Sequence, residues 1–320
     1  MLLNIRVAGL ANGLKRLAVL LMFGMLLAGN TLVEAQQEPM YSQYMFNMLN
    51  VNPAYAGNSG ADNVTLLYRM QWAGVDGAPR TGTFSWDRRQ AESNVGYGLQ
   101  IYNDRLGIEN TTGFQAFYSY RLRFQKSNLT LGLSAGALNY QATYSRVAVI
   151  QGNDPRFMED VNSILPSIGF GAIYSAERIY VGFSIPALLN TKIDNNNEPV
   201  VTSANNHYFL TGGYIFDLSD AVKLKPSLLV KAVKGSPLAV DINMNAWFQD
   251  KVGLGVSYRA GDALVGLFEM QLSPKFRVGY AYDFVISNLK TYNLGGSHEL
   301  MLRYEFNNPK NQRVMSPRYY

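Results

Sequence analysis

Cysteine is absent from all 320 residues, which excludes disulfide bonds, thiolate metal sites and a lipid anchor on an N-terminal cysteine. Histidine is scarce. His207 and His298 lie far apart in the sequence, and a lone histidine is more often a hydrogen-bonded structural residue than a metal ligand. Charged residues make up 16% of the chain, and a net charge of +5 is too weak to indicate nucleic-acid binding.

Long apolar runs are missing too, apart from one near the N-terminus. Basic residues precede the run LAVLLMFGMLLAG at 17–29, and the small residues Val33 and Ala35 come after it. This order is typical of a secretory signal peptide, which we predict at residues 1–35. The run is well short of the roughly 20 residues that a membrane-spanning helix needs, which disfavours the alternative of a retained anchor.

The rest of the chain is rich in tyrosine and glycine, and apolar and polar residues alternate along it. From 64 to 72, large apolar residues share one face of an extended chain, and Thr65 and Arg69 lie on the other. The pattern recurs at 238–248, 276–286 and 299–306. A soluble β-sandwich alternates as well, but aromatic residues near strand ends and small polar residues on the opposite face favour an apolar face against lipid. We therefore predict an all-β fold, a transmembrane outer-membrane β-barrel.

The predicted barrel spans residues 62–307 and contains about fourteen antiparallel strands, with twelve or sixteen as alternatives. The segments are 62–73, 80–89, 94–103, 109–124, 128–141, 164–176, 178–186, 205–218, 221–232, 237–248, 251–260, 262–272, 275–287 and 296–307. Connections after the even-numbered segments are short, whereas 142–163 and 187–204, after odd-numbered segments, are long. Outer-membrane barrels have short periplasmic turns and longer external loops, so we expect both termini on the periplasmic side.

The predicted inner face carries charges of both signs. They are Asp241, Glu269, Asp283, Glu299, Glu305, Arg69, Arg121, Arg123, Lys223, Lys225, Lys231, Arg277 and Arg303. Such charges usually pair with each other and hold the wall rigid, and a conduction path is the alternative. The adjacent pair Ser297-His298 has no obvious orienting carboxylate, and the Ca²⁺-compatible oxygens at 194–198 more often belong to a solvated loop. We expect no catalytic residue, no cofactor and no metal.

The uncharged segment MYSQYMFNMLNVNPAYAG, at 40–57, precedes the first strand. Four residues recur at helical spacing: Tyr41, Tyr44, Met45 and Met48. Asn52 and Pro53 then end the helix, because proline cannot continue the hydrogen bonding, and with Tyr55 they fix the exit of the chain. We predict that residues 36–61 form a short periplasmic helix that packs its Tyr/Met face against or within the barrel mouth and closes the lumen.

Two motifs in this segment, QYMFN at 43–47 and NPAYAG at 52–57, resemble the N-terminal signature of the PorP/SprF family of type IX secretion system membrane proteins. Further stretches are similar to the later sequence of that family: RMQW at 69–72, PRT at 79–81, 96–107, and RYEF at 303–306. The resemblance covers essentially the whole chain after residue 35. It implies an outer-membrane barrel that serves type IX secretion or gliding motility.

The resemblance also implies partners. Members of the family handle cell-surface adhesins or other cargo with a type B C-terminal sorting domain, or link to periplasmic motor-associated components. Partner contacts are then expected on the long loops and on the basic tail 308–320, which alternatively is a plain disordered tail. The candidate residues are Arg156, Phe157, Asp194, Asn196, Arg313, Arg318 and Tyr320. Two other classes remain open: a channel for a small or hydrophobic solute, gated by the N-terminal helix, and a barrel enzyme, for which no nucleophile is apparent.

Overall fold

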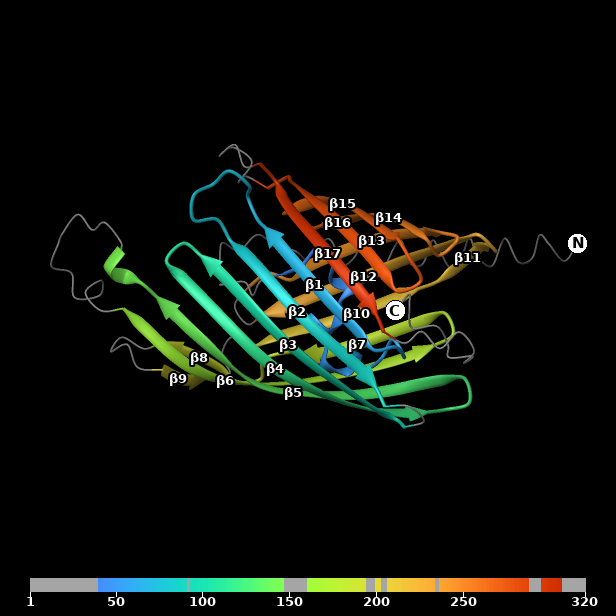
Figure 1. Ribbon diagram of the computed structural model, residues 1–320, viewed down its shortest axis with the longest axis horizontal. Helices are drawn as coiled ribbons and strands as arrows, with labels where there is room; N and C mark the ends of the chain where they lie inside the picture. The colour runs from blue at the N-terminus through green and yellow to red at the C-terminus, as the bar shows by residue number, and fades with distance from the viewer. Residues whose placement is uncertain are drawn as a thin grey trace, which may run out of the picture.

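The computed structural model describes residues 40–90, 93–146, 160–193, 199–202, 206–233, 236–287 and 295–306. Within these residues the chain forms a closed antiparallel β-barrel whose wall has 14 strands, as the sequence predicts (Figure 1). No helix in the described part of the chain is long and apolar enough to cross a membrane.

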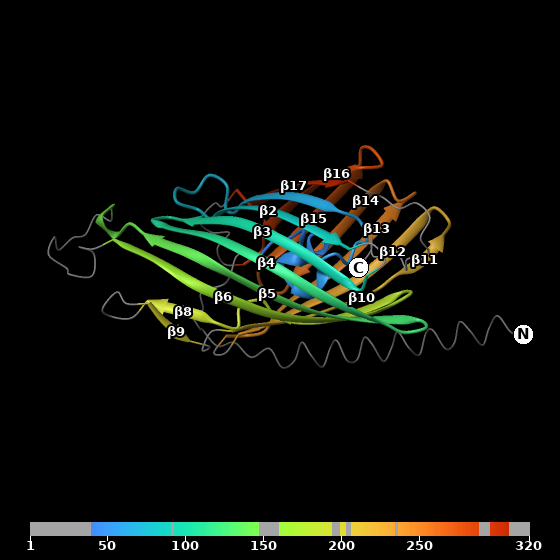
Figure 2. The ribbon, with the colours of Figure 1, turned by 60° about the horizontal axis from the view of Figure 1, so that its bottom comes forward.

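The first half of the wall is a continuous meander. Its strands are β1 (Asn63–Met70), β2 (Arg80–Arg89), β3 (Val95–Leu106), β4 (Glu109–Arg123), β5 (Ser127–Ala142), β6 (Val161–Ala176) and β7 (Ile179–Ile185). A separate two-stranded sheet, β8 (Asn190–Ile193) and β9 (Pro199–Thr202), lies beside the long strand β6 (Figure 2).

The second half begins with β10 (His207–Tyr214) and β11 (Phe216–Ser219), which form one wall strand interrupted at Ile215. The remaining strands are β12 (Val222–Val233), β13 (Ala239–Phe248), β14 (Val252–Arg259), β15 (Ala263–Gln271), β16 (Phe276–Val285) and β17 (Ser297–Glu305). The wall closes where β1 pairs with β17 in an unbroken register, from Asn63 opposite Glu305 to Met70 opposite His298. Closure leaves neither strand with an unpaired edge.

The two rims of the barrel differ in the length of their connections. On the short-turn rim the connections are 90–94, 124–126, 177–178, 220–221, 249–251 and 272–275. On the long-loop rim, four of the connections are long: 71–79, 143–160, 186–206 and 286–296. The sequence predicts this separation of short and long connections. It also gives the direction of each strand: β1 starts at the short-turn rim, and β2 starts at the long-loop rim.

The two faces of the wall follow the predicted alternation. In β1, Leu66 and Tyr68 point outward and are about half exposed, whereas Thr65 and Arg69 point into the lumen and are buried. In β13, the outward Ile242 and Met244 alternate with buried polar residues in the same way. A belt of exposed apolar side chains around a closed barrel fits contact with lipid.

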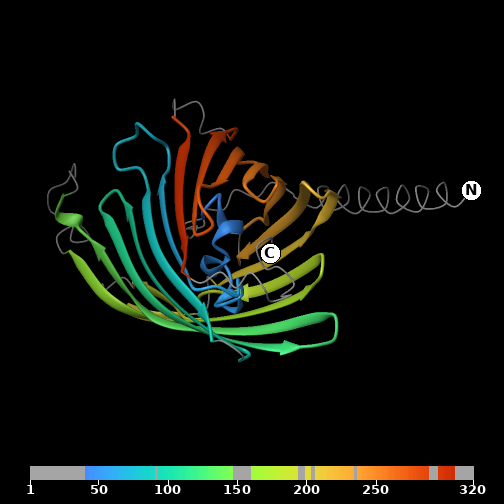
Figure 3. The ribbon, with the colours of Figure 1, turned by 45° about the vertical axis from the view of Figure 1, so that its right-hand side comes forward.

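The segment before β1 lies inside the barrel (Figure 3). Where the sequence predicts a single short helix, the structure has three separate turns of 3₁₀-helix: η1 (Tyr44–Phe46), η2 (Met48–Asn50) and η3 (Pro53–Tyr55). Asn47 and Asn52 interrupt the helical geometry, with φ values of −137° and −144°. Their side chains bond to the wall, and asparagine competes with helix formation in this way because its amide replaces backbone partners.

Candidate functional site

The lumen segment, residues 40–58, fills the centre of the barrel. It contains all seven residues singled out there by their sequence, and the structure places each of them in buried surroundings: Tyr41, Tyr44, Met45, Met48, Asn52, Pro53 and Tyr55. The wall therefore surrounds a polypeptide core rather than an open channel at this level.

One side of the lumen segment forms an apolar core with the wall. Tyr44, Met45 and Met48 belong to a buried cluster with residues of β6, β7, β10, β12, β13 and β15, namely Ile173, Tyr180, Phe209, Leu229, Trp247, Val265 and Leu267. The sequence predicts a polar interior, and the structure differs because these inward apolar residues pack against the Tyr/Met face. Close packing of this kind stabilises the segment much as the core of a soluble domain does.

Within this core, two asparagine amides of β13 bond to the lumen segment. The Asn243 amide donates a hydrogen bond of 2.6 Å to the Tyr44 hydroxyl, and the Asn245 amide lies 2.9 Å from the Met45 sulfur. The segment thus presents neutral groups to β13.

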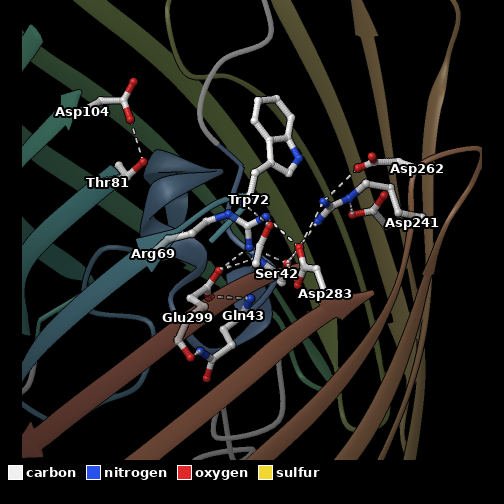
Figure 4. Close-up of polar contacts among 12 residues, drawn as sticks. Ser42, Gln43, Arg69, Trp72, Thr81, Asp104, Asp241, Asp262, Asp283 and Glu299 are labelled. Carbon is white, nitrogen blue, oxygen red and sulfur yellow. Dashed lines mark hydrogen bonds and ion pairs between the residues drawn. The ribbon is translucent and has the colours of Figure 1, made fainter. Parts of the chain in front are cut away.

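The long-loop half of the lumen contains a group of buried charges that we call the charged clamp: Arg69, Asp241, Arg259, Asp283 and Glu299 (Figure 4). The Arg69 guanidinium bridges Asp283 at 2.7 Å and Glu299 at 3.0 Å. Arg259 lies 3.4 Å from Asp241 and 3.6 Å from Asp283, so it joins two acids that come from different strands. Charges this deeply buried need such mutual pairing, because each has lost its hydration.

The charged clamp holds the lumen segment by its backbone. The amides of Ser42 and Gln43 each donate a 2.8 Å hydrogen bond to one carboxylate oxygen of Glu299. The Ser42 hydroxyl donates to Asp283 at 2.7 Å and accepts from Arg69 at 2.8 Å. Hydrogen bonds to charged partners are stronger than neutral ones, so Ser42 is fixed in position and register.

Further along, the segment packs against an uncharged region of the wall that we call the glycine seat: Gly96, Gly132, Gly171 and Gly182, with Ser119 and Ser184. A methyl group added at Gly132 would overlap the backbone of Pro53 and Ala54. The Ser119 hydroxyl donates to the Ala56 carbonyl at 2.7 Å, while the Asn52 amide donates to the carbonyls of Ala172 and Phe183 at 3.2 Å each. Only strands with small inward residues admit a backbone this closely.

The segment leaves the lumen at the short-turn rim. There the Gly57 amide donates to Asp87 at 3.0 Å, and the Arg89 guanidinium donates to the carbonyls of Gly57 and Asn58 at 3.0 Å each. Arg121 bonds to the Asn58 side chain. Gly57 has a φ of 64°, and a side chain there would overlap the Arg88 carbonyl, so glycine is needed at this exit.

Several site residues are not evident from the sequence. The backbone amides of Ser42 and Gln43 donate to Glu299, and the sequence gives no signal for this role, because it does not depend on the identity of their side chains. Arg259 could have been found, because it shares the alternation of the inward glycines Gly253 and Gly255. Arg123, expected on the inner face, ends β4 at the short-turn rim, where its side chain is exposed and bonds to the Ser93 carbonyl at 3.1 Å.

The adjacent residues Ser297 and His298 lie on opposite faces of the wall. Ser297 is buried in the lumen, while His298, the next residue, lies on the outer face and bonds to the Tyr280 hydroxyl at 2.7 Å. In the described residues there is no cluster of three or more His, Asp or Glu side chains that could hold a metal ion. The partner candidates Arg156, Phe157, Asp194, Asn196, Arg313, Arg318 and Tyr320 lie outside the described residues.

Residues 33–304 match the model of one protein family, described as type IX secretion system membrane protein PorP/SprF. The chain belongs to the PorP/SprF family. No curated protein matches the sequence. Membership of the PorP/SprF family makes this barrel an outer-membrane component of type IX secretion.

Solved structures similar to this PorP/SprF-family barrel include other outer-membrane proteins. Omp33 of Acinetobacter baumannii has a TM-score of 0.46 at 8% identity, covering 77% of this chain and 98% of its own. The CymD monoaromatic hydrocarbon channel has a TM-score of 0.46 at 11% identity, covering 86% and 95%. The Ralstonia pickettii toluene transporter TbuX has a TM-score of 0.46 at 10% identity, covering 81% and 93%. For the present chain, it is the family that indicates a structural or transport role rather than an enzymatic one.

Proposed function

We propose that this PorP/SprF-family barrel binds secreted cell-surface proteins that carry a type B C-terminal sorting domain and anchors them in the outer membrane. We further propose that it contacts periplasmic components of the secretion or gliding machinery. Family membership supports the type IX setting. The filled lumen supports an anchor within that setting.

A rigid, self-filled barrel suits an anchor better than a solute channel. The lumen segment is bonded to strands on both halves of the wall, including β2, β4, β7, β13 and β17. A solute path through the same space requires this segment to leave, which means breaking the charged clamp and exposing the apolar core. The filled interior stiffens the scaffold, and binding is left to the rims.

The long-loop rim is the proposed surface for the cargo, with Arg156, Phe157, Asp194 and Asn196 as candidate contacts in its two largest connections. Long loops on a rigid scaffold are where binding residues concentrate. The C-terminal tail, with Arg313, Arg318 and Tyr320, is the proposed periplasmic contact, because β17 runs toward the short-turn rim.

The test is affinity capture of the tagged protein from native membranes in mild detergent, with mass spectrometry of the proteins that accompany it. We expect large surface proteins with C-terminal sorting domains, together with periplasmic secretion components. A barrel captured alone would contradict the anchor role. Solute flux in liposomes containing the purified barrel would then support the channel function.

Two matched variants separate the proposed surfaces. Arg156→Ala with Phe157→Ala should reduce capture of the surface protein at least several-fold and leave periplasmic partners unchanged. Arg313→Ala with Arg318→Ala should do the reverse. Equal loss of both partners in both variants would indicate a folding defect, which heat-modifiable electrophoretic mobility detects.

A further inference from the structure

The direction in which the lumen segment runs is fixed by its contacts with a single strand. β2 starts at the long-loop rim and ends at the short-turn rim. Its inward residues contact the segment in order: Tyr41 with Thr83, Asn47 with Ser85, Gly57 with Asp87, and Asn58 with Arg89. The lumen segment therefore runs in the same direction as β2, from the long-loop rim to the short-turn rim.

The charged clamp gives the same direction independently. Arg69 is next to the last residue of β1, Asp283 lies near the end of β16, and Glu299 lies near the start of β17. All three positions belong to the long-loop half of the wall, and all three bind Ser42 or Gln43. At the other end, the segment joins β1 at the short-turn rim, where Gly57 is bonded to Asp87.

The segment cannot be placed the other way round without breaking these contacts. Each Glu299 oxygen accepts one backbone amide, from Ser42 and Gln43, so the clamp fixes both the register and the polarity of the backbone. At Gly132, the glycine seat brings the wall against the backbone of Pro53 and Ala54. Long loops mark the external rim of outer-membrane barrels.

We infer that the lumen segment threads the barrel from the outside inward, so that its N-terminal end, at Met40, opens on the cell exterior. This differs from the periplasmic N-terminus that the sequence predicts. The predicted signal peptide ends at Ala35, close to Met40 in the sequence. Cleavage there leaves only residues 36–39 before Met40, which lies at the same end of the barrel as the long loops proposed to bind cargo.

The absence of cysteine makes the orientation directly measurable. A single cysteine is introduced by Met40→Cys, and intact cells are treated with a membrane-impermeant maleimide before and after permeabilisation of the outer membrane. Met40 is partly exposed, and its side chain also packs against the apolar core. Asp76→Cys, in the exposed connection 71–79, is the control for the long-loop rim, and Asp220→Cys, in the exposed turn 220–221, is the control for the short-turn rim.

We expect the Met40 and Asp76 variants to react fully in intact cells, and the Asp220 variant to react only after permeabilisation. Reaction of the Met40 variant only after permeabilisation overturns the inferred direction. If the Asp76 and Asp220 controls exchange behaviour, the long-loop rim is periplasmic and the external position of Met40 is wrong.

A second variant guards against a folding defect. An epitope inserted immediately before Met40 leaves every described contact of the lumen segment in place. We expect an antibody to detect it on intact cells that display a heat-modifiable barrel. Detection only after permeabilisation overturns the inference. The proposed cargo binding is tested separately by affinity capture, so the two proposals can fail independently.

Discussion

At its long-loop end the lumen segment bonds to four charged side chains of the clamp, whereas further along, at Asn52 and Ala54, it meets bare glycine and backbone carbonyls. Both regions are buried and both fix the segment, but by different physical means. In the charged clamp each ion has lost its hydration and depends on its partners. In the glycine seat the fit is a matter of volume and a few neutral hydrogen bonds.

This contrast indicates where the structure tolerates change. A buried ion pair gives little net stability over an apolar replacement, yet removal of one partner leaves the others as uncompensated charges. A close-packed neutral contact loses stability in proportion to the volume or bond that is changed. Substitutions in the charged clamp should therefore cause a large loss of stability, whereas the loss for substitutions in the glycine seat should grow gradually with the volume or bond that is changed.

The largest effect is expected for Arg69→Ala, because it leaves Asp283 and Glu299 facing each other without their shared cation. We expect a loss of about 3–5 kcal/mol in the free energy of unfolding. Urea-induced unfolding in lipid vesicles, followed by tryptophan fluorescence, measures it. The matched control is Arg88→Ala, whose side chain is 54% exposed beside Asp62 and should change stability by less than about 1 kcal/mol. Equal losses in the two variants would contradict a special role of the charged clamp.

Gly132→Ala should have the next largest effect, since its methyl group would overlap the backbone of Pro53 and Ala54. Overpacking of this kind destabilises by roughly 1–3 kcal/mol and should raise the susceptibility of the lumen segment to protease. Gly266→Ala is the control, because no atom lies within 4 Å of a methyl group there on the outer face. If both variants unfold at the wild-type urea concentration, the glycine seat is not close-packed.

Asn52→Ala removes one amide that donates to two wall carbonyls and a side-chain oxygen that caps η3. We expect a loss of about 1–2 kcal/mol, the usual effect of leaving buried groups unpaired and a helix uncapped. The same unfolding experiment applies. Asn103→Ala, whose amide bonds to the side chains of Asn110 and Thr112 in an exposed setting, should change stability much less. The reverse ranking would show that Asn52 does not anchor the segment.

The smallest effect is expected for Tyr44→Phe, which keeps the ring in the apolar core and removes only the hydroxyl that Asn243 binds. The loss should be about 0.5–1.5 kcal/mol. Tyr118→Phe, with its side chain 45% exposed on the outer face, is the comparison variant. A loss at Tyr44 as large as that of Arg69→Ala would remove the distinction between charged and neutral anchoring.

Much of the wall could be predicted from residues 62–307, because alternation is a local property of an extended chain. The outward position of Leu66 and the inward position of Arg69 both follow from it. The ends of the strands are harder to predict: β1 ends at Met70 instead of including Trp72, which has a φ of 47°. The alternation of residues in the sequence does not show at which residue the backbone hydrogen bonds of a strand end near the rim.

The candidate site was predicted only in part. The apolar spacing of Tyr41, Tyr44, Met45 and Met48 indicates a packed segment, and the structure buries all four. The clamp could not be derived in the same way, since Ser42 bonds to Asp283 and Glu299, more than two hundred positions away in the chain. Periodicity within one strand says which side chains point inward, but not which of them meet across the lumen.

The class of fold, the number of wall strands and the face that most wall residues occupy could thus be read from the residues alone. They depend on hydrophobic alternation and connection length, which are properties of residues close together in the chain. The path of the segment before β1 could not be read from the residues alone. This segment fills the lumen as three short turns and runs from the long-loop rim to the short-turn rim. It is held by charges at one end and by glycine further along. Those features depend on closure of the barrel, which brings β1 and β17 side by side and surrounds the segment with residues from distant parts of the chain.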